Sequence, residues 1–110
     1  MSYNRNPDIE ADISFIPTNE GGRATPAWQG YRVDHDFGIK GRINVAQHEF
    51  IGCDSAEPGQ KVRSRLWFMV PEQQKNRLHP GFKFTVCEGG RIVAYGIVTR
   101  VINQELRSGI

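Results

Sequence analysis

The tetrapeptide Glu-Gly-Gly-Arg occurs twice in this chain of 110 residues, at Glu20–Arg23 and again at Glu88–Arg91. Two adjacent glycines give the backbone access to positive φ angles, so each copy predicts a tight reversal of the chain. The second copy lies between two runs of alternating apolar residues, which is the pattern of a β-hairpin. Each turn also carries a glutamate and an arginine, which in a purely structural interpretation pair across the rim of the fold.

Strands are predicted along most of the chain. Ile9–Phe15 alternates apolar and polar residues, and Pro17 ends this strand. The same reasoning predicts strands at 31–37, around Ile43 and Val45, from Lys61 to about Val70, from Phe82 to Cys87 and from Ile92 to Ile102. The last run is apolar on both faces, which favours a central position. About six strands without helical periodicity predict one small all-β domain, an antiparallel barrel or sandwich, with tails at 1–7 and 104–110.

The charges are unevenly distributed. Residues 1–60 carry 5 Lys and Arg against 9 Asp and Glu, a balance of −4, whereas residues 61–110 carry 9 against 3, a balance of +6. An anionic partner would meet the second half first if the fold gathers these charges on one side; interleaved strands would average the difference away. There is no signal peptide, apolar spanning run, or zinc or redox spacing around Cys53 and Cys87, so we expect a cytoplasmic protein without metal or cofactor.

In order along the chain, these features resemble the C-terminal β-barrel, domain III, of elongation factor Tu. The resemblance covers residues 8–103. It is carried by Ile9–Phe15, Glu20–Arg23 with Thr25 and Pro26, Gly30–Arg32, Pro58 and Gly59, Leu66, Pro71, Gly81 and Phe82, and Glu88–Arg91 with Val93, Gly96, Val98 and Val101. The resemblance implies a closed barrel of about six antiparallel strands.

The parent family is a GTPase that delivers aminoacyl-tRNA to the ribosome. This chain has no phosphate-binding loop of the G-x-x-x-x-G-K-[ST] kind, so we expect no GTP binding. In the family, the barrel grips the T-stem of tRNA, docks on the GTPase domain and contacts the exchange factor Ts. The resemblance therefore implies a binding module and not an enzyme.

The tRNA role transfers only residue by residue. The family's T-stem glutamate corresponds to Glu88, and Tyr31-Arg32 is kept. Asp34 replaces the glutamine that follows this pair, and its carboxylate would repel phosphate. Lys40 stands near a contacting threonine of the family, and Cys87 replaces a basic residue.

The predicted strand that begins at Lys61 is a second candidate RNA-binding surface. Lys61, Arg63, Arg65 and Trp67 share one face, so the cations would follow a phosphate backbone while the indole stacks on a base. The alternative is that these charges only solvate the outer face of an antiparallel sheet. The candidate RNA-binding or partner-binding residues are Arg32, Arg63, Arg65, Trp67, Glu88, Gly89, Gly90 and Arg91.

No catalytic constellation emerges from the sequence. His35 lies between Asp34 and Asp36, but neighbours on a strand point to opposite faces, so one site cannot include all three. A solvated strand edge is the expected structure there. His48 and His79 lie in separate polar segments without ligand spacing, and neither cysteine has an evident base partner.

The expected function is therefore non-enzymatic binding in the context of translation. The first hypothesis is mimicry, in which a lone domain III-like barrel engages a partner of elongation factor Tu, or acts as a decoy or immunity protein against a toxin directed at the translation machinery. The second hypothesis is binding of tRNA or another structured RNA through the T-stem-type surface and the basic second half. A third is that the chain is a fragment of a larger factor. None of the three involves a membrane.

Overall fold

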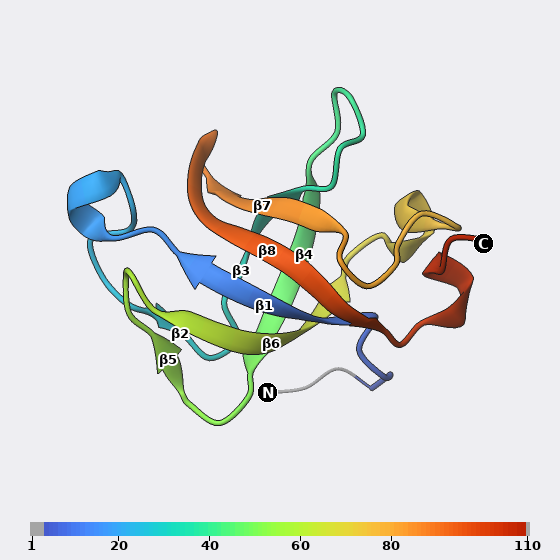
Figure 1. Ribbon diagram of the computed structural model, residues 1–110, viewed down its shortest axis with the longest axis horizontal. Coiled ribbons are helices and arrows are strands. Elements are labelled where there is room, and N and C mark those ends of the chain that lie inside the picture. Colours follow the sequence, from blue (N-terminus) through green and yellow to red (C-terminus); the bar gives the residue numbers. More distant parts are fainter. Residues whose placement is uncertain (1–3, 110) are drawn as a thin grey trace.

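The computed structural model describes residues 4–109 and is built almost entirely of strands (Figure 1). The strands are β1 (Ile9–Phe15), β2 (Ala27–Trp28), β3 (Arg32–Asp36), β4 (Asn44–Phe50), β5 (Ser55–Ala56), β6 (Lys61–Phe68), β7 (Lys83–Glu88) and β8 (Arg91–Val101). Three short 3-10 helices complete the fold: η1 (Thr18–Glu20), η2 (Pro71–Gln74) and η3 (Gln104–Leu106).

Six of these strands close into an antiparallel barrel in the order β1-β6-β4-β3-β7-β8, and β8 pairs with β1 to complete the ring. The two-residue strands β2 and β5 form a separate ribbon at one end (Figure 1). The predicted all-β closed antiparallel barrel is confirmed. Closure leaves none of the six strands with an unpaired edge along its full length.

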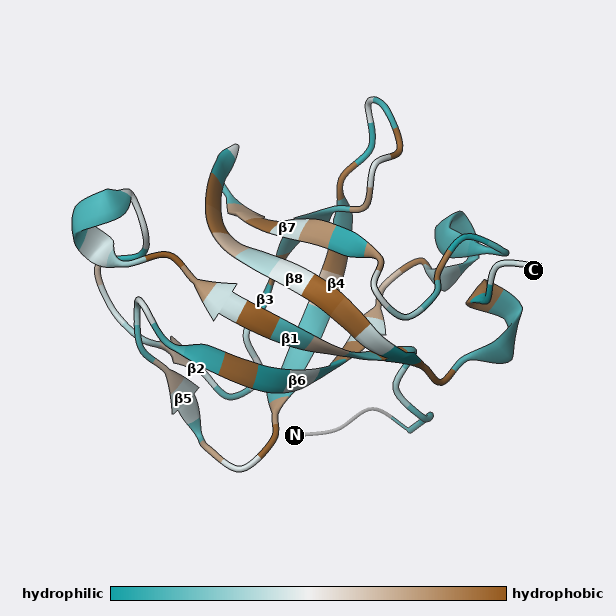
Figure 2. Ribbon diagram, in the orientation of Figure 1, coloured by the Kyte–Doolittle hydropathy of each residue, from teal (hydrophilic) through white to brown (hydrophobic). Residues whose placement is uncertain are grey.

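Alternation along each strand decides what the barrel contains. In β1 the apolar residues Ile9, Ala11, Ile13 and Phe15 are buried, whereas the intervening acidic and polar residues face outward. β6 repeats the pattern in its first half, with Val62 buried between exposed cations. Figure 2 shows the resulting bands of apolar and polar residues along the strands.

The glycines of the two Glu-Gly-Gly-Arg copies meet two different requirements. Gly21, Gly89 and Gly90 have φ angles of 98°, 58° and 81°, so both reversals depend on left-handed backbone, as predicted. Gly22 has no positive φ. It is required because a Cβ atom there would lie 1.8 Å from the carbonyl oxygen of Ile16, where only glycine fits.

Both ends of the described chain pack against the barrel. The buried carboxylate of Asp8 accepts hydrogen bonds from Arg5, at 2.9 and 3.1 Å, from the Phe68 N–H, at 2.7 Å, and from Asn103 Nδ2, at 2.9 Å. Leu106 in η3 is also buried, and its carbonyl oxygen accepts the N–H of Leu78 at 2.7 Å. These contacts join the segments before β1 and after β8.

β8 pairs with β1 on one side and with β7 on the other, as expected of a central strand, but its outward side chains Ile92, Tyr95 and Ile97 remain exposed. The run is apolar on both faces although only one face lies in the core. An uncovered apolar face of this kind is a candidate contact surface.

Candidate functional site

The two Glu-Gly-Gly-Arg copies meet in space. The Arg23 guanidinium forms an ion pair with the Glu88 carboxylate, which also accepts the hydroxyl hydrogen bond of Tyr31. The Arg23 guanidinium carbon additionally lies 5.1 Å from the centre of the Tyr31 ring. We call Arg23, Tyr31 and Glu88 the rim cluster. It matches the structural interpretation of the turns, because the arginine of the first copy pairs with the glutamate of the second.

Within the rim cluster, the Glu88 carboxylate, to which the resemblance assigns RNA contact, is already bonded to Arg23 and Tyr31. Burial and the hydrogen bond to Glu88 both raise the pKa of the Tyr31 hydroxyl above its ordinary value, so the phenol stays protonated and donates. Arg32 and Arg91 are exposed near this end, and within residues 4–109 their side chains make no ion pair. Glu88 is thus satisfied internally, and those two arginines are the cations left available nearby.

The cations of β6 are neutralised by the strands on either side. Arg63 Nε lies 3.0 Å from an Asp12 oxygen, and Arg65 lies 3.7 Å from Glu10 and 3.2 Å from Glu49. The register produces these pairs, because Asp12 stands opposite Arg63 and Glu10 opposite Arg65 in the β1–β6 ladder. The β6 face is therefore a lattice of alternating charges, which is how a sheet solvates its outer surface.

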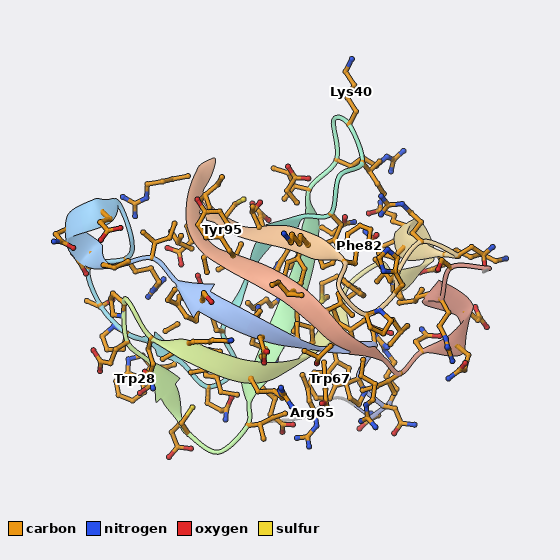
Figure 3. All side chains as sticks on the ribbon, viewed as in Figure 1. Trp28, Lys40, Arg65, Trp67, Phe82 and Tyr95 are labelled. Carbon is orange, nitrogen blue, oxygen red and sulfur yellow. The ribbon has the colours of Figure 1, made fainter. Side chains whose placement is uncertain are left out.

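Trp67 lies on the same outward face of β6 but is only 4% exposed. Its Nε1–H donates to the carbonyl oxygen of Arg5 at 2.8 Å, so the segment before β1 lies against the indole. Figure 3 places Arg65 and Trp67 close together on the side of the barrel away from Lys40. Stacking of this ring on a base, one of the two alternatives for the β6 face, would require the segment before β1 to leave the indole.

The interior of the barrel holds a polar network that the sequence analysis missed. His35 and His48 are fully buried, with their Nε2 atoms 2.8 Å apart and their rings stacked at 5.0 Å. His48 Nδ1 lies 2.8 Å from the hydroxyl of buried Ser64. The predicted solvated strand edge at Asp34–Asp36 is therefore wrong at its central residue. The period of two was the available signal, because His35 shares a face with Val33 and Phe37.

The hydrogen bonds allow one neutral arrangement of protons. The Val33 carbonyl oxygen only accepts, so His35 Nδ1–H must donate to it at 2.9 Å, which leaves His35 Nε2 as an acceptor. His48 Nε2–H then donates to His35, and the Ser64 hydroxyl donates to His48 Nδ1. Burial lowers the pKa of His35 to about 4 and that of His48 well below its ordinary value, so both rings stay neutral. Ser64 is itself fully buried, so its hydroxyl does not meet substrate in this conformation.

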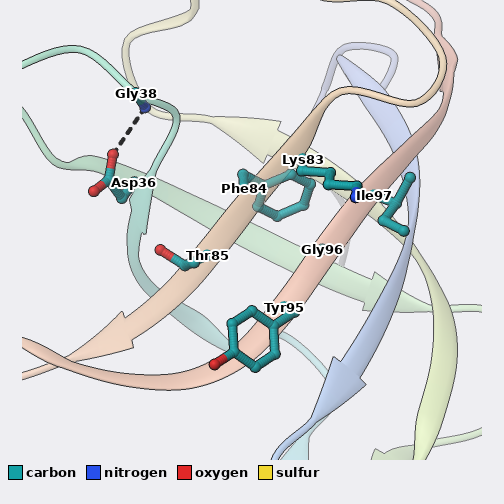
Figure 4. A pocket seen from close by; sticks show the side chains of 8 residues that line it. All are labelled: Asp36, Gly38, Lys83, Phe84, Thr85, Tyr95, Gly96 and Ile97. Carbon is teal, nitrogen blue, oxygen red and sulfur yellow. Dashed lines mark hydrogen bonds between the residues drawn. The ribbon is translucent and has the colours of Figure 1, made fainter.

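A hollow on the outside lies over β7 and β8, beside the loop that follows β3 (Figure 4). Its volume is about 500 Å³. The lining residues are Asp36, Gly38, Lys83, Phe84, Thr85, Tyr95, Gly96 and Ile97. Phe84 and Gly96 are buried, whereas Tyr95 and Ile97 are 54% and 43% exposed. The apolar outer residues of β8 thus border a concavity.

A second pocket of similar volume adjoins the first, because Asp36 and Gly38 line both. It lies within the loop between β3 and β4, where it is bordered by Lys40, Arg42 and Ile43. Figure 3 shows Lys40 at the tip of this projecting loop. We call the two pockets together the β7–β8 groove. We call the end in the loop, which carries Lys40 and Arg42, its basic end, and the end over β7 and β8, which is bordered by Tyr95 and Ile97, its apolar end.

Three cations of the groove have no counter-ion. Within residues 4–109 the side chains of Lys40, Arg42 and Lys83 form neither ion pairs nor hydrogen bonds. The Asp36 carboxylate in the same groove accepts the Gly38 N–H at 2.8 Å. These cations therefore contrast with Arg63 and Arg65, whose charges are matched by neighbouring strands. None of the three was among the predicted site residues, since the groove is assembled by sheet closure.

In the described part of the chain, no cluster of three or more His, Cys, Asp or Glu side chains has the geometry to hold a metal ion. No helix between residues 4 and 109 is long and apolar enough to cross a membrane. No model of a known protein family matches the sequence.

Proposed function

We propose that this protein is a non-enzymatic binding module that engages a protein partner through the β7–β8 groove. One observation carries the proposal: exposed apolar side chains of β8 border a concavity whose cations have no internal counter-ion. Protein interfaces typically combine an apolar centre with a polar rim that contributes specificity. Tyr95 and Ile97 supply the centre, and Lys83 with the projecting loop supplies the rim.

The resemblance to domain III of elongation factor Tu supplies the class of partner. Under this proposal the barrel acts in the cytoplasm as a mimic of that domain, and engages a protein that normally binds elongation factor Tu or docks on its GTPase domain. A decoy or immunity role against a toxin directed at translation belongs to the same proposal. This part rests on sequence features and on fold analogy alone.

Binding of tRNA is the competing function, and it would use Arg32, Arg91 and Glu88 at the end of the β7–β8 hairpin. The ion pairs on β6 weigh against an extended phosphate track, because Arg63 and Arg65 already face carboxylates on both neighbouring strands. RNA binding would also have to release Glu88 from Arg23 and Tyr31.

The test is affinity capture from bacterial lysate with the wild-type protein and a Tyr95→Ser/Ile97→Ser variant. A Trp28→Ser variant is the matched control, since Trp28 is 65% exposed on β2, outside the groove. The lysate is divided into ribonuclease-treated and untreated portions, and bound protein and RNA are quantified separately at low and high salt.

The proposal expects a stoichiometric protein that survives ribonuclease, is retained by Trp28→Ser and is lost with Tyr95→Ser/Ile97→Ser. If the protein is elongation factor Tu, its exchange factor or another ligand of that factor, the translation role is supported. Absence of any such protein at saturating bait concentration would overturn the proposed function. Enrichment of tRNA alone, vanishing steeply with salt, would assign the competing function.

A further inference from the structure

We infer that the β7–β8 groove binds a partner segment in which an aromatic or aliphatic side chain is flanked by carboxylates. This inference rests on the proposed function and specifies the chemistry of the partner. It follows from the two ends of the groove, which differ in character and are joined at Asp36 and Gly38.

The apolar end fits one bulky side chain. Between the outward side chains, Phe84 stands opposite Gly96, and the buried Phe84 ring covers Gly96 on the core side, where a Cβ atom would lie 2.2 Å from the ring. Neither residue therefore places a side chain on the outer face. Tyr95 and Ile97 stand outward on the same strand, with Thr85 opposite Tyr95 and Lys83 opposite Ile97 on β7 (Figure 4). A partner side chain placed between them would remove apolar surface from water on both molecules.

The basic end requires negative charge. Lys40 and Arg42 at this end, with Lys83 at the edge of the apolar end, contribute three positive charges against the single carboxylate of Asp36, which already accepts a backbone N–H from Gly38. Elsewhere on the barrel, Arg63, Arg65 and Arg100 each face a carboxylate within 4 Å. Carboxylates from a partner would give the groove the charge complementarity that the β6 face already has internally.

A polypeptide fits this surface better than RNA. A nucleic-acid track alternates cations with several stacking rings along a backbone path. The groove instead has one exposed ring, Tyr95, with the isoleucines Ile39, Ile43 and Ile97, and a carboxylate at the junction of its pockets. Asp36 would repel a phosphate at that junction, whereas a peptide can place an uncharged residue there.

The experiment is an NMR titration of the whole ¹⁵N-labelled protein with two capped hexapeptides. The probe is Ac-Asp-Glu-Phe-Leu-Asp-Glu-amide, and its charge-reversed control is Ac-Lys-Arg-Phe-Leu-Lys-Arg-amide. We expect the acidic peptide to shift amide signals of residues 36–43, 83–85 and 95–97, with an affinity that falls as salt rises. Lys83→Glu should weaken binding by about three- to tenfold. Lys75→Glu, the same charge change at an exposed site outside the groove, should leave the affinity unchanged.

Several results would overturn the inference. They are shifts located on other surfaces, equal binding of both peptides, equal effects of Lys83→Glu and Lys75→Glu, or a uridine hexanucleotide shifting the groove where the acidic peptide does not. A captured protein that depends on Tyr95 and Ile97, together with a groove indifferent to the acidic peptide, would refute this chemistry and leave the proposed function standing. Specific binding of the acidic peptide supports the inference even if lysate capture fails.

Discussion

Acidification from pH 7.5 to pH 5 should destabilise this protein through its buried histidine pair. His35 and His48 are neutral in the folded state, and both recover their ordinary affinity for protons when the chain unfolds. The unfolded state therefore binds more protons than the folded state below pH 6.5. Stability conferred by the neutral rings is complete above that pH and is lost as the pH falls toward 4.

The magnitude for His35 follows from its two pKa values. With a folded pKa of about 4 and an unfolded pKa of 6.5, the free energy of unfolding falls by about 1.4 kcal/mol per pH unit across the window between them. At pH 5 the loss from His35 is about 2 kcal/mol. His48 acts in the same direction, because burial and the neighbouring His35 both lower its pKa.

Urea unfolding followed by tryptophan fluorescence at pH 7.5, 6.5, 5.5 and 5.0 measures this loss. A domain of this size has an m value of about 1–2 kcal/mol/M, so the urea midpoint should fall by about 1 M or more. A His35→Gln/His48→Gln variant should show a much flatter pH dependence. His79→Gln should keep the wild-type slope, because His79 is the third histidine of the chain and is exposed.

Two outcomes would refute the reasoning. One is a free energy of unfolding that stays constant between pH 7.5 and 5. The other is an undiminished slope in the double variant, which would assign the acid sensitivity to groups outside the pair.

The remaining predictions concern the rim cluster, the buried carboxylate of Asp8 and the contact between Gly96 and the Phe84 ring. Tyrosine absorbance at 295 nm during alkaline titration should show Tyr31 ionising well above the ordinary value near 10. The stability that the protonated phenol confers is complete below pH 10 and is lost as the pH rises from there through the raised pKa. Glu88→Gln should bring this ionisation to lower pH, and simultaneous ionisation of all tyrosines in both proteins would contradict the prediction. Asp8→Ala should lower the free energy of unfolding by about 3–5 kcal/mol, because the buried Phe68 N–H and the Asn103 amide lose their acceptor. Asp54→Ala, at an exposed site, should change the free energy of unfolding by less than about 0.5 kcal/mol in the same urea assay. Gly96→Ala should cost about 1–3 kcal/mol through contact with the Phe84 ring, and Phe84→Leu in the same chain should recover part of that cost; strictly additive losses would disprove the steric cause.

The sequence predicted what depends on neighbouring residues. The hairpin of β7 and β8 follows from adjacent apolar runs around two glycines, and β1 follows from seven alternating residues before a proline. The charges of β6 were also assigned to the correct face. These features are local, so the period of two and the turn chemistry suffice to define them.

What escaped prediction depends on residues far apart in the chain. The ion pair of Arg23 with Glu88 joins residues 65 positions apart, and the match of Asp12 to Arg63 requires the register of β1 on β6. The acidic residues on either side of His35 favour a solvated strand edge, but His35 lies on the opposite face of the strand, which points into the barrel. The β7–β8 groove combines β3, its following loop, β7 and β8, so only the closed barrel reveals it.

The position of β1 between β6 and β8 also constrains the order of events when the chain is made. Of the six barrel strands β1 is synthesised first, and its neighbours are β6, which starts at Lys61, and β8, which ends at Val101. Ile9 therefore pairs with a residue 92 positions later in the chain. The ring cannot close while the last strand is still inside the ribosomal exit tunnel. The apolar side chains of β1 therefore stay partly uncovered until β8 has emerged, and pairing over such separations is slow compared with local hairpin formation. During that interval Ile9–Phe15 is exposed to aggregation and to chaperones.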